Sequence, residues 1–315
     1  MIRIYDCSNS SERPRHRAIS LCPKENDIVR DLKANAYLFD CEFINNYRKA
    51  DVLFTNDVFP KHLINSSKFK VKRMDGTFWR KDLVKRNERL NNSAERADYV
   101  IFISQYSSNS YYDLYGKGVN RSTIILNNVC GIFRRLRSFT SEVPKVFTAN
   151  ASNWEREEKR FKDLMLLAKH IAGQITLIGK CRLPVARNVI KLGYVDDYLK
   201  LNNILNSSDA FINLSYRDAA PKVVCQAVAC GLPILYADSG GTRELIDYGV
   251  SIYEGDILDF RNRTPRLELK SMLQGYNELK ERYLELENLA RQPRRNYFNT
   301  LNRYFNVFKM CKENK

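Results

Sequence analysis

Short apolar runs alternate with amphipathic stretches in the second half of the chain, and this is the clearest pattern in the sequence. The stretches between the runs repeat apolar residues at helical spacing, as at Phe161, Leu164 and Ala168. Strands that alternate with helices favour a parallel sheet with helices on both faces. The apolar runs predict strands at 143–148, 175–178, 189–192, 210–214 and 234–237.

Start and stop signals define three helices of this half. The aspartates at 196–197 can cap a helix that runs through Leu205. Pro221 suits the first turn of a helix, and Gly231 is suited to end it. A further helix is predicted to begin near Thr242, directly after two consecutive glycines.

The first half shows a less clear α/β pattern. A polar helix is predicted over 80–96, and Ser104 can cap a second helix that Gly116 follows. Residues 137–144 are the predicted linker to the second half. Strands are predicted at 2–5, 52–55, 69–73, 99–104 and 122–126.

Residues 264–312 contain two stripes of apolar and aromatic side chains at helical spacing. We expect two amphipathic helices that pack on the body of the protein, an interpretation favoured over helices that lie on a membrane. The stripes are Leu273, Tyr276, Leu279, Tyr283 and Leu286, then Phe298, Leu301, Tyr304, Phe305 and Phe308.

Length and composition fit two globular domains in a reduced compartment. The chain has 315 residues, of which 44% are hydrophobic, and no run of about 18 apolar residues that would predict a membrane span. The eight cysteines form no CxxC pair, and the first twenty residues lack the apolar core of a secretory signal. We therefore expect a cytoplasmic protein.

The net charge of +16 is uneven, because residues 1–140 hold 25 basic and 15 acidic residues. A protein with this excess of positive charge can bind phosphorylated small molecules or make peripheral contact with an anionic membrane. The charges can also simply face solvent. No zinc finger, RNP-type box or basic zipper is visible, so nucleic acid is a disfavoured partner.

The most informative chemistry lies between Asn213 and Glu244. A loop after a predicted strand carries Asp218, and eight residues later a predicted helix carries Gln226 among apolar neighbours. A second loop supplies two glycines, at 240–241, where a helix is expected to start. Backbone amides at such a helix start favour a phosphate, and parallel sheets bind ligands at loops of this kind.

This segment resembles the family-4 retaining glycosyltransferases, whose pattern is Ser-x-x-Glu, a second Glu, Ala-x-Ala-Cys-Gly-x-Pro and Gly-Gly-x-x-Glu. Ser215 falls at the serine, and Asp218 and Gln226 fall at the two glutamates. The remaining matches are Ala227, Ala229, Cys230, Gly231, Pro233, Gly240, Gly241 and Glu244.

The resemblance implies a GT-B fold, with two Rossmann-like domains that face each other across a cleft. It implies transfer of a hexose-type sugar from a UDP- or GDP-sugar to a hydroxyl, with retention of configuration and with no metal or other cofactor. The acceptor would be a glycan or a lipid-linked saccharide in polysaccharide biosynthesis. The expected domains are an acceptor-side domain at 1–140, a donor-side domain at 141–292 and a final helix at 293–315 that crosses back.

The resemblance also implies roles for single residues. Asp218 would lie near the transferred sugar, and Lys159 would contact the donor phosphates as a catalytic cation. Trp154 stands where the family places a partner arginine, so Arg156 or Arg160 would substitute for it. A solvated Lys159 in a helix is the alternative from the residues alone.

The other predicted contacts follow from the same pattern. On the acceptor side, the Arg-x-Asp-Gly element suggests Arg73 and Asp75, although an aspartate before a glycine is also an ordinary turn. The predicted donor-binding residues are Ser215, Lys222, Gln226, Tyr194, Ser239, Gly240, Gly241, Thr242 and Glu244.

Two departures from the family pattern leave a second hypothesis open. Gln226 can hydrogen-bond a ribose hydroxyl but lacks the charge of a glutamate, and Asp218 is one methylene shorter. A protein that binds a nucleotide sugar without turning it over is therefore the alternative.

Overall fold

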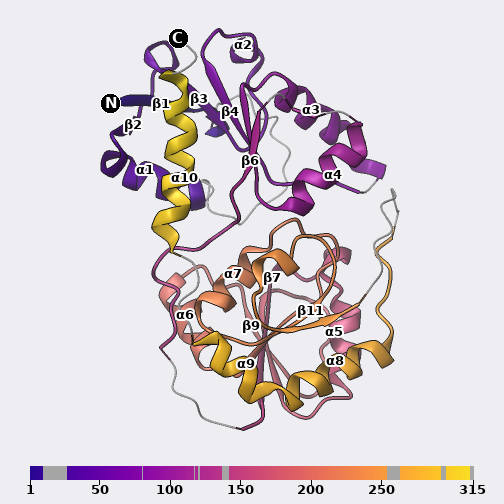
Figure 1. Ribbon diagram of the computed structural model, residues 1–315. Helices are drawn as coiled ribbons and strands as arrows, with labels where there is room; N and C mark the ends of the chain where they lie inside the picture. The colour runs from indigo at the N-terminus through magenta and orange to yellow at the C-terminus, as the bar shows by residue number, and fades with distance from the viewer. Residues whose placement is uncertain are drawn as a thin grey trace. The chain divides into compact units, whose positions relative to one another are not determined.

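The computed structural model describes residues 1–9, 27–79, 81–116, 118–119, 121–136, 142–253, 263–291 and 296–312. The chain forms two α/β units (Figure 1): Met1–Leu126 together with Asn296–Lys315, and Asn127–Arg295. Each unit is built on a parallel six-stranded sheet with helices against it.

The sheet of the first unit has the strand order β2-β1-β3-β4-β5-β6, and every neighbouring pair is parallel. Its strands are β1 Ile2–Asp6, β2 Cys41–Phe43, β3 Val52–Thr55, β4 Phe69–Met74, β5 Tyr99–Phe102 and β6 Ser122–Ile124. Its helices are α1 Asp27–Asn35, α2 Lys61–Ile64, α3 Val84–Glu95, α4 Gln105–Tyr115 and α10 Tyr297–Lys309.

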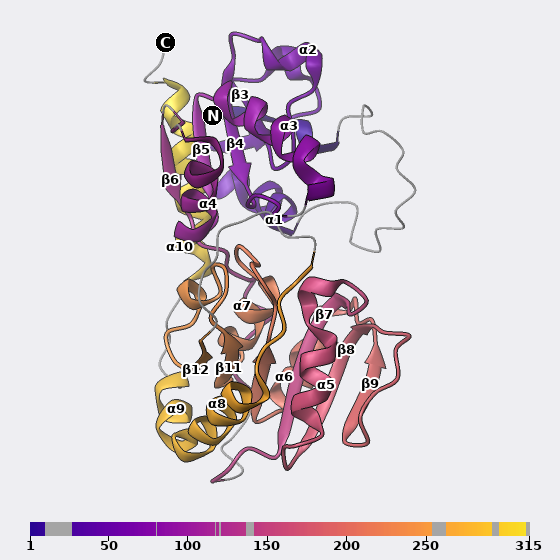
Figure 2. The same ribbon diagram turned by 90° about the vertical axis from the view of Figure 1, so that its right-hand side faces the viewer.

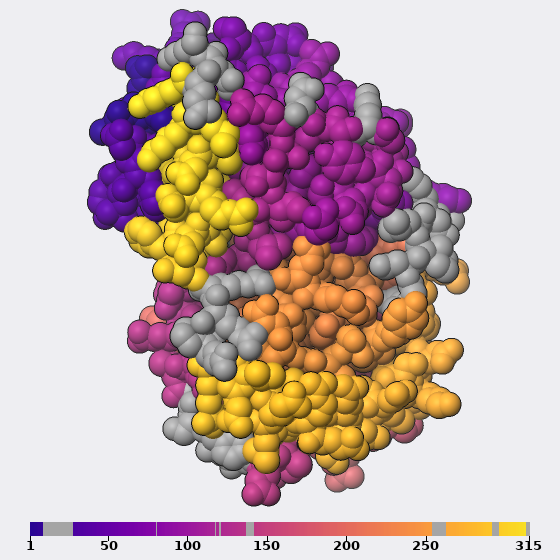
Figure 3. All heavy atoms as spheres, viewed as in Figure 1, coloured from indigo at the N-terminus to yellow at the C-terminus, as the bar shows by residue number. Residues whose placement is uncertain are grey.

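Successive side chains of these strands point to opposite faces, so two cores form on one sheet. Phe54 of β3 packs with Phe305 and Phe308 of α10, whereas Leu53 belongs to the opposite core with Leu90 of α3. Figure 1 shows α1 and α10 on one side of the sheet and α3 and α4 on the other. The last helix of the chain therefore completes the core of the first unit, and its outer side lies on the surface (Figure 3).

The sheet of the second unit has the order β12-β11-β10-β7-β8-β9 and is also parallel throughout; Figure 2 shows β7, β8 and β9 side by side. Its strands are β7 Val146–Asn153, β8 Gln174–Lys180, β9 Val189–Gly193, β10 Ala210–Asn213, β11 Ile234–Ala237 and β12 Val250–Ile252. Its helices are α5 Phe161–Ala168, α6 Tyr198–Asn206, α7 Lys222–Ala229, α8 Leu269–Glu281 and α9 Tyr283–Ala290.

Local capping explains why several helices begin and end where the sequence predicts. The side chain of Asp197 accepts hydrogen bonds from the first backbone amides of α6, at 2.8 and 3.1 Å. Ser104 caps α4 in the same way, and Gly116 ends it in the left-handed conformation at φ +63°. Pro221 directly precedes α7.

Two helix predictions were wrong. After the two glycines the chain forms a 3-10 turn at Arg243–Leu245, becomes extended at Ile246 and enters β12 at Val250. The predicted helix through Leu286 is two helices, α8 and α9, which are separated at Arg282. Sequence patterns also missed the short elements α1, α2, β2 and β12.

The boundary between the units lies after Leu126, not after residue 140 as predicted. The side-chain amide of Asn127 donates to the backbone carbonyl of Ala220 at 2.8 Å, and Arg135 forms a 2.7 Å ion pair with the buried Glu287. These bonds attach residues 127–135 to the second unit. Most of the predicted linker, residues 137–141, lies outside the described residues.

The described part of the chain contains no helix that is long and apolar enough to cross a membrane.

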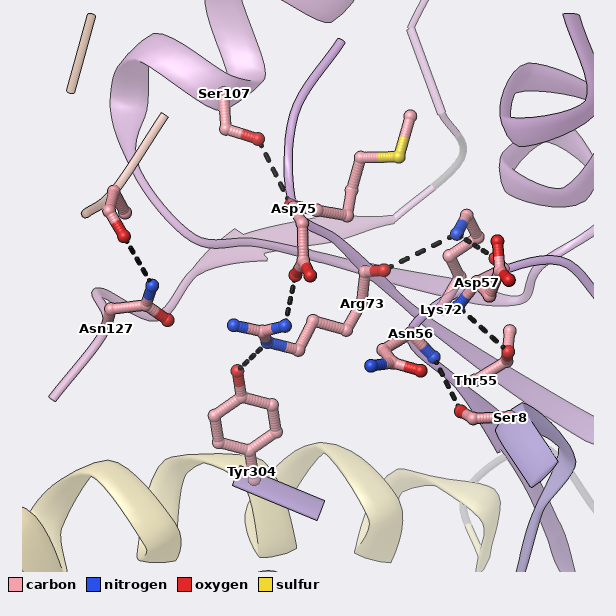
Figure 4. Close-up of polar contacts among 12 residues, drawn as sticks. Ser8, Thr55, Asn56, Asp57, Lys72, Arg73, Asp75, Ser107, Asn127 and Tyr304 are labelled. Carbon is pink, nitrogen blue, oxygen red and sulfur yellow. Dashed lines mark hydrogen bonds and ion pairs between the residues drawn. The ribbon is translucent and has the colours of Figure 1, made fainter. Parts of the chain in front are cut away.

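Strand β4 carries a lysine that is completely buried. The Lys72 ammonium donates hydrogen bonds to the backbone carbonyls of Asp57 and Arg73 (Figure 4). Burial lowers the pKa of this ammonium to about 8, although the Asp57 and Asp75 carboxylates oppose the shift. The charged form of Lys72 therefore destabilises the folded state at neutral pH.

We expect this penalty to disappear as the pH rises. Between about pH 8 and 10.5 the unfolded chain binds more protons at Lys72 than the folded chain does, so the contribution of Lys72 to stability rises with pH. The free energy of unfolding of Lys72→Met, relative to wild type, should fall by up to about 1.4 kcal/mol per pH unit across that range. Urea unfolding at several pH values measures this, with exposed Lys85→Met as the control. A difference independent of pH would contradict it.

Candidate active site

The candidate site lies at the carboxyl ends of β7 and β10 in the second unit. Here the strand order reverses, because the chain runs from β7 outward through β8 and β9 and then returns to β10 on the other side. The loops after these two strands diverge at such a reversal, which is where open α/β sheets bind ligands. The loop after β7 carries Lys159, and the loop after β10 carries Ser215 and Asp218.

An ion pair joins these two loops. The Lys159 ammonium lies 2.8 Å from the Asp218 carboxylate and 3.5 Å from the Ser215 hydroxyl, which in turn donates to the side chain of Asn213 at 3.0 Å. The Lys159 side chain is 11% exposed and that of Asp218 is 27% exposed. Lys159 is thus a fixed and largely buried cation, not a solvated helix lysine, and the structure brings it together with two other predicted residues.

The two glycines form a turn that packs against the same loop. Gly240 is left-handed at φ +71°, and a Cβ on it would lie 2.3 Å from the carbonyl oxygen of Asp218. The amide of Gly241 donates to that carbonyl at 2.9 Å, and the amide of Arg217 donates to the Ser239 hydroxyl at 2.9 Å. The turn therefore fixes the loop that carries Asp218, and glycine is required at position 240.

Three buried polar atoms of the second unit have no hydrogen-bond partner among the described residues. They are the Nδ2 of Asn213, the Oε1 of Gln226 and the Oγ1 of Thr242. The three residues are only 4%, 7% and 0% exposed, and they come from β10, α7 and the loop after β11. An unsatisfied buried polar group costs about 1–3 kcal/mol, so this set fits a site that a polar ligand or water completes.

Asn213 had no role in the sequence analysis. The sequence does show a polar residue at the end of an apolar run, and in the structure this residue is the last of β10, at the switch in strand order. Sequence alone could not show the reversal of strand order that gives this position its meaning.

The predicted phosphate arginines have other partners. Arg156 is 52% exposed and pairs with Glu158. Arg160 is buried, donates to the carbonyl of Pro265 at 3.1 Å and lies 3.8 Å from Asp163, and burial lowers its pKa to about 10. Trp154 packs in the core and donates its indole N–H to a backbone carbonyl at 2.8 Å.

The remaining donor-side predictions are more scattered. Lys222 is half-buried at the start of α7, and Glu244 lies in the 3-10 turn after the glycines. Tyr194 follows the edge strand β9, which β8 separates from β7, so it is the predicted residue furthest from the switch point in strand order.

The predicted acceptor residues lie in the first unit (Figure 4). Arg73 is 1% exposed, donates through Nε to the Tyr304 hydroxyl of α10 at 3.0 Å and contacts the Asp75 carboxylate. The Asp75 side chain itself is 49% exposed. Arg73 is therefore not an ordinary surface ion: it is a buried cation that holds an accessible carboxylate at the end of β4.

Further polar groups meet where the strand order of the first unit reverses, between β1 and β3. The backbone amide of Asn56 donates to the Ser8 hydroxyl at 3.1 Å (Figure 4), and the buried Oδ1 of Asn56 has no partner among the described residues. Neither residue had a predicted role. Across the described ranges of both units, no three His, Cys, Asp or Glu side chains lie together as a metal site would require.

Comparison with known proteins points to one class. Residues 152–267 match the family model described as Glycosyl transferases group 1. WcaC of Escherichia coli (strain K12), to which glycosyl transfer in colanic acid biosynthesis is attributed, is 25% identical over 169 residues, 49% of this chain and 40% of WcaC. The match thus spans less than half of that relative's length. In both comparisons the matched part of the chain is thus similar to glycosyltransferases.

Similar folds occur in solved glycosyltransferases. Sucrose-phosphate synthase of Thermosynechococcus elongatus gives a TM-score of 0.69 at 11% identity, over 99% of this chain and 89% of that one. HepE of Anabaena, solved with UDP and glucose, gives 0.63 at 12%, over 100% and 98%. WaaG, a glycosyltransferase involved in lipopolysaccharide biosynthesis, gives 0.61 at 10%, over 99% and 98%. At such identities the likeness shows the fold, and the predicted GT-B class is confirmed.

The geometry of the glycine turn leads to a stability prediction. Gly240→Ala should lower the free energy of unfolding by more than Gly116→Ala does. Both glycines are left-handed, at φ +71° and +63°, which costs an alanine about 1–2 kcal/mol, but a Cβ at Gly116 meets no atom within 4 Å. Denaturant unfolding of the two variants compares the losses directly. Equal losses would mean that Gly240 is not in tight contact with the carbonyl of Asp218.

Proposed function

We propose that this protein is a glycosyltransferase that uses a UDP- or GDP-sugar and that its second unit binds the donor. The observation that carries the proposal is the Lys159–Asp218 ion pair at the switch in strand order, next to the glycine turn and three unsatisfied buried polar atoms. The match of residues 152–267 to group 1 glycosyltransferases covers all of these groups. The presence of UDP and glucose in the structure of HepE supports this donor class.

The chemistry expected of this site is charge stabilisation. When the bond between sugar and diphosphate breaks, negative charge develops on the departing phosphate, and a fixed cation stabilises it. Lys159 would supply that cation, and Asp218 would orient it and accept hydrogen bonds from the sugar. Gln226 would face the ribose, where its Oε1, which has no partner among the described residues, can accept a hydrogen bond from a hydroxyl.

The charge of the phosphate would be stabilised mainly by side-chain cations, because the helix start predicted after the glycines is absent. The turn after the glycines is three residues long, and the amide of Gly241 is already bonded to the carbonyl of Asp218. A short 3-10 turn has a much smaller dipole than a helix of several turns. The glycines would mainly allow the donor to approach the backbone closely.

On the acceptor side, we propose that Asp75 binds a hydroxyl of a glycan or a lipid-linked saccharide. Arg73 contacts this carboxylate, and the exposed side chain of Asp75 remains accessible to a ligand. Polysaccharide or lipopolysaccharide assembly is the proposed setting, in line with the activities attributed to WcaC and WaaG. Retention of anomeric configuration is proposed from the family-4 resemblance, and proton NMR of the product's anomeric centre tests it.

A thermal-shift panel of UDP, GDP, ADP and their sugars tests the donor site. A ligand that binds the folded state at 100 times its dissociation constant stabilises it by about 2.7 kcal/mol, so the matching nucleotide should raise Tm clearly. Lys159→Ala should abolish the shift because it removes the phosphate cation, and Gly241→Asp should do so because it adds a charge that repels the phosphate.

The exposed Lys162→Ala, three residues along in α5, serves as the matched control and should keep the full shift. If Lys159→Ala and Gly241→Asp both responded to nucleotide as wild type does, the donor would bind elsewhere.

A further inference from the structure

The candidate donor site needs a second cation besides Lys159 to balance the charge of a diphosphate. A nucleotide sugar carries about two negative charges on its diphosphate, and Arg and Lys side chains are the usual partners of such groups. Lys159 is the first cation, but Asp218 at 2.8 Å already balances its charge. A site that binds the diphosphate without a metal therefore needs another positive group close to this pair.

Three other arginines on the adjoining loops lie near carboxylates. Arg156 pairs with Glu158, Arg243 pairs with Asp238, and the buried Arg160 lies 3.8 Å from Asp163. Asp163 also pairs with Arg266, so Arg160 shares this carboxylate. Arg217 lies in the binding loop itself, between Ser215 and Asp218.

The backbone of Arg217 is held in a costly conformation. It is left-handed at φ +49°, although it is not a glycine. Its amide donates to Ser239 at 2.9 Å, and the amide of the preceding Tyr216 donates to the carbonyl of Glu158 at 2.8 Å. Contacts to the loops after β7 and β11 therefore fix this residue, and strain of this kind concentrates at functional sites.

Aromatic stacking also orders the Arg217 side chain. Its guanidinium lies 4.9 Å from the centre of the Tyr216 ring, and the guanidinium of Arg160 lies at the same distance. A half-buried arginine that stacks on a ring loses less side-chain freedom when it binds a ligand than a solvated one does. The stacking thus orders the Arg217 guanidinium against Tyr216, in the loop that carries Asp218, before any donor binds.

We propose that Arg217 is the second cation that binds the donor diphosphate, in place of the arginine position that Trp154 occupies in this chain. The inference deepens the proposed function and rests on it. Arg217 comes from the loop after β10, so both cations of the site would flank the switch in strand order, Lys159 from one strand and Arg217 from the other.

Isothermal titration calorimetry of the full chain with UDP and UMP tests this, or with GDP and GMP if guanosine is the base selected in the thermal-shift panel. Wild type should bind the diphosphate more tightly than the monophosphate. Arg217→Ala should weaken diphosphate binding by about 10- to 100-fold and leave monophosphate binding nearly unchanged, because it removes a charged hydrogen-bond donor to the outer phosphate. Arg217→Lys should recover part of the loss.

The ratio of the two affinities separates a phosphate contact from a damaged fold, which would weaken both ligands together. Arg243→Ala, an exposed arginine on the adjoining turn, is the matched control and should keep the wild-type ratio. The inference would be overturned if Arg217→Ala kept the ratio or lowered both affinities equally, or if Arg156→Ala lost it instead. If wild type bound none of UDP, GDP and ADP, the proposed donor site would fall first and Arg217 with it.

Discussion

The loop after β10 is fastened by hydrogen bonds to the loops on either side of it, and the candidate site depends on that arrangement. Tyr216 is bonded to the backbone after β7, while Asp218 is bonded to the glycine turn after β11. Three strands thus hold a short segment that has almost no regular structure of its own. The position of the Lys159–Asp218 pair follows from these bonds rather than from either loop alone.

Buried polar groups give this site its chemical character. A folded protein normally pairs such groups, since each unpaired one costs free energy. In the second unit the unpaired atoms of Asn213, Gln226 and Thr242 come from β10, α7 and the loop after β11. The first unit shows a related device at Arg73, which is buried at the end of a strand and holds an exposed carboxylate. In both units, therefore, buried polar groups at the carboxyl edge of a parallel sheet cost some of the free energy of folding.

The two units follow one structural plan. In each, the first strand lies inside the sheet, and the later strands extend from it in two directions. The reversal falls between β1 and β3 in one unit and between β7 and β10 in the other, and polar residues gather at both places. This arrangement accounts for the likeness to GT-B glycosyltransferases at identities of 10–12%, because the topology persists when most side chains have changed.

The sequence by itself determined most of the strands, the ends of several helices and the segment that carries the chemistry. Apolar runs, Ser104, Asp197 and Gly116 act through their immediate neighbours, so their effects can be predicted from a few consecutive residues. Tertiary structure alone decided the rest. Lys159 and Asp218 are 59 residues apart, and Arg73 meets Tyr304 across 231 residues. The turn after Gly241 ends at Leu245, and from Val250 the chain pairs with β11 as β12, a pairing that the sheet as a whole decides. Contacts of this kind depend on which strands become neighbours, and no local pattern of residues encodes that choice.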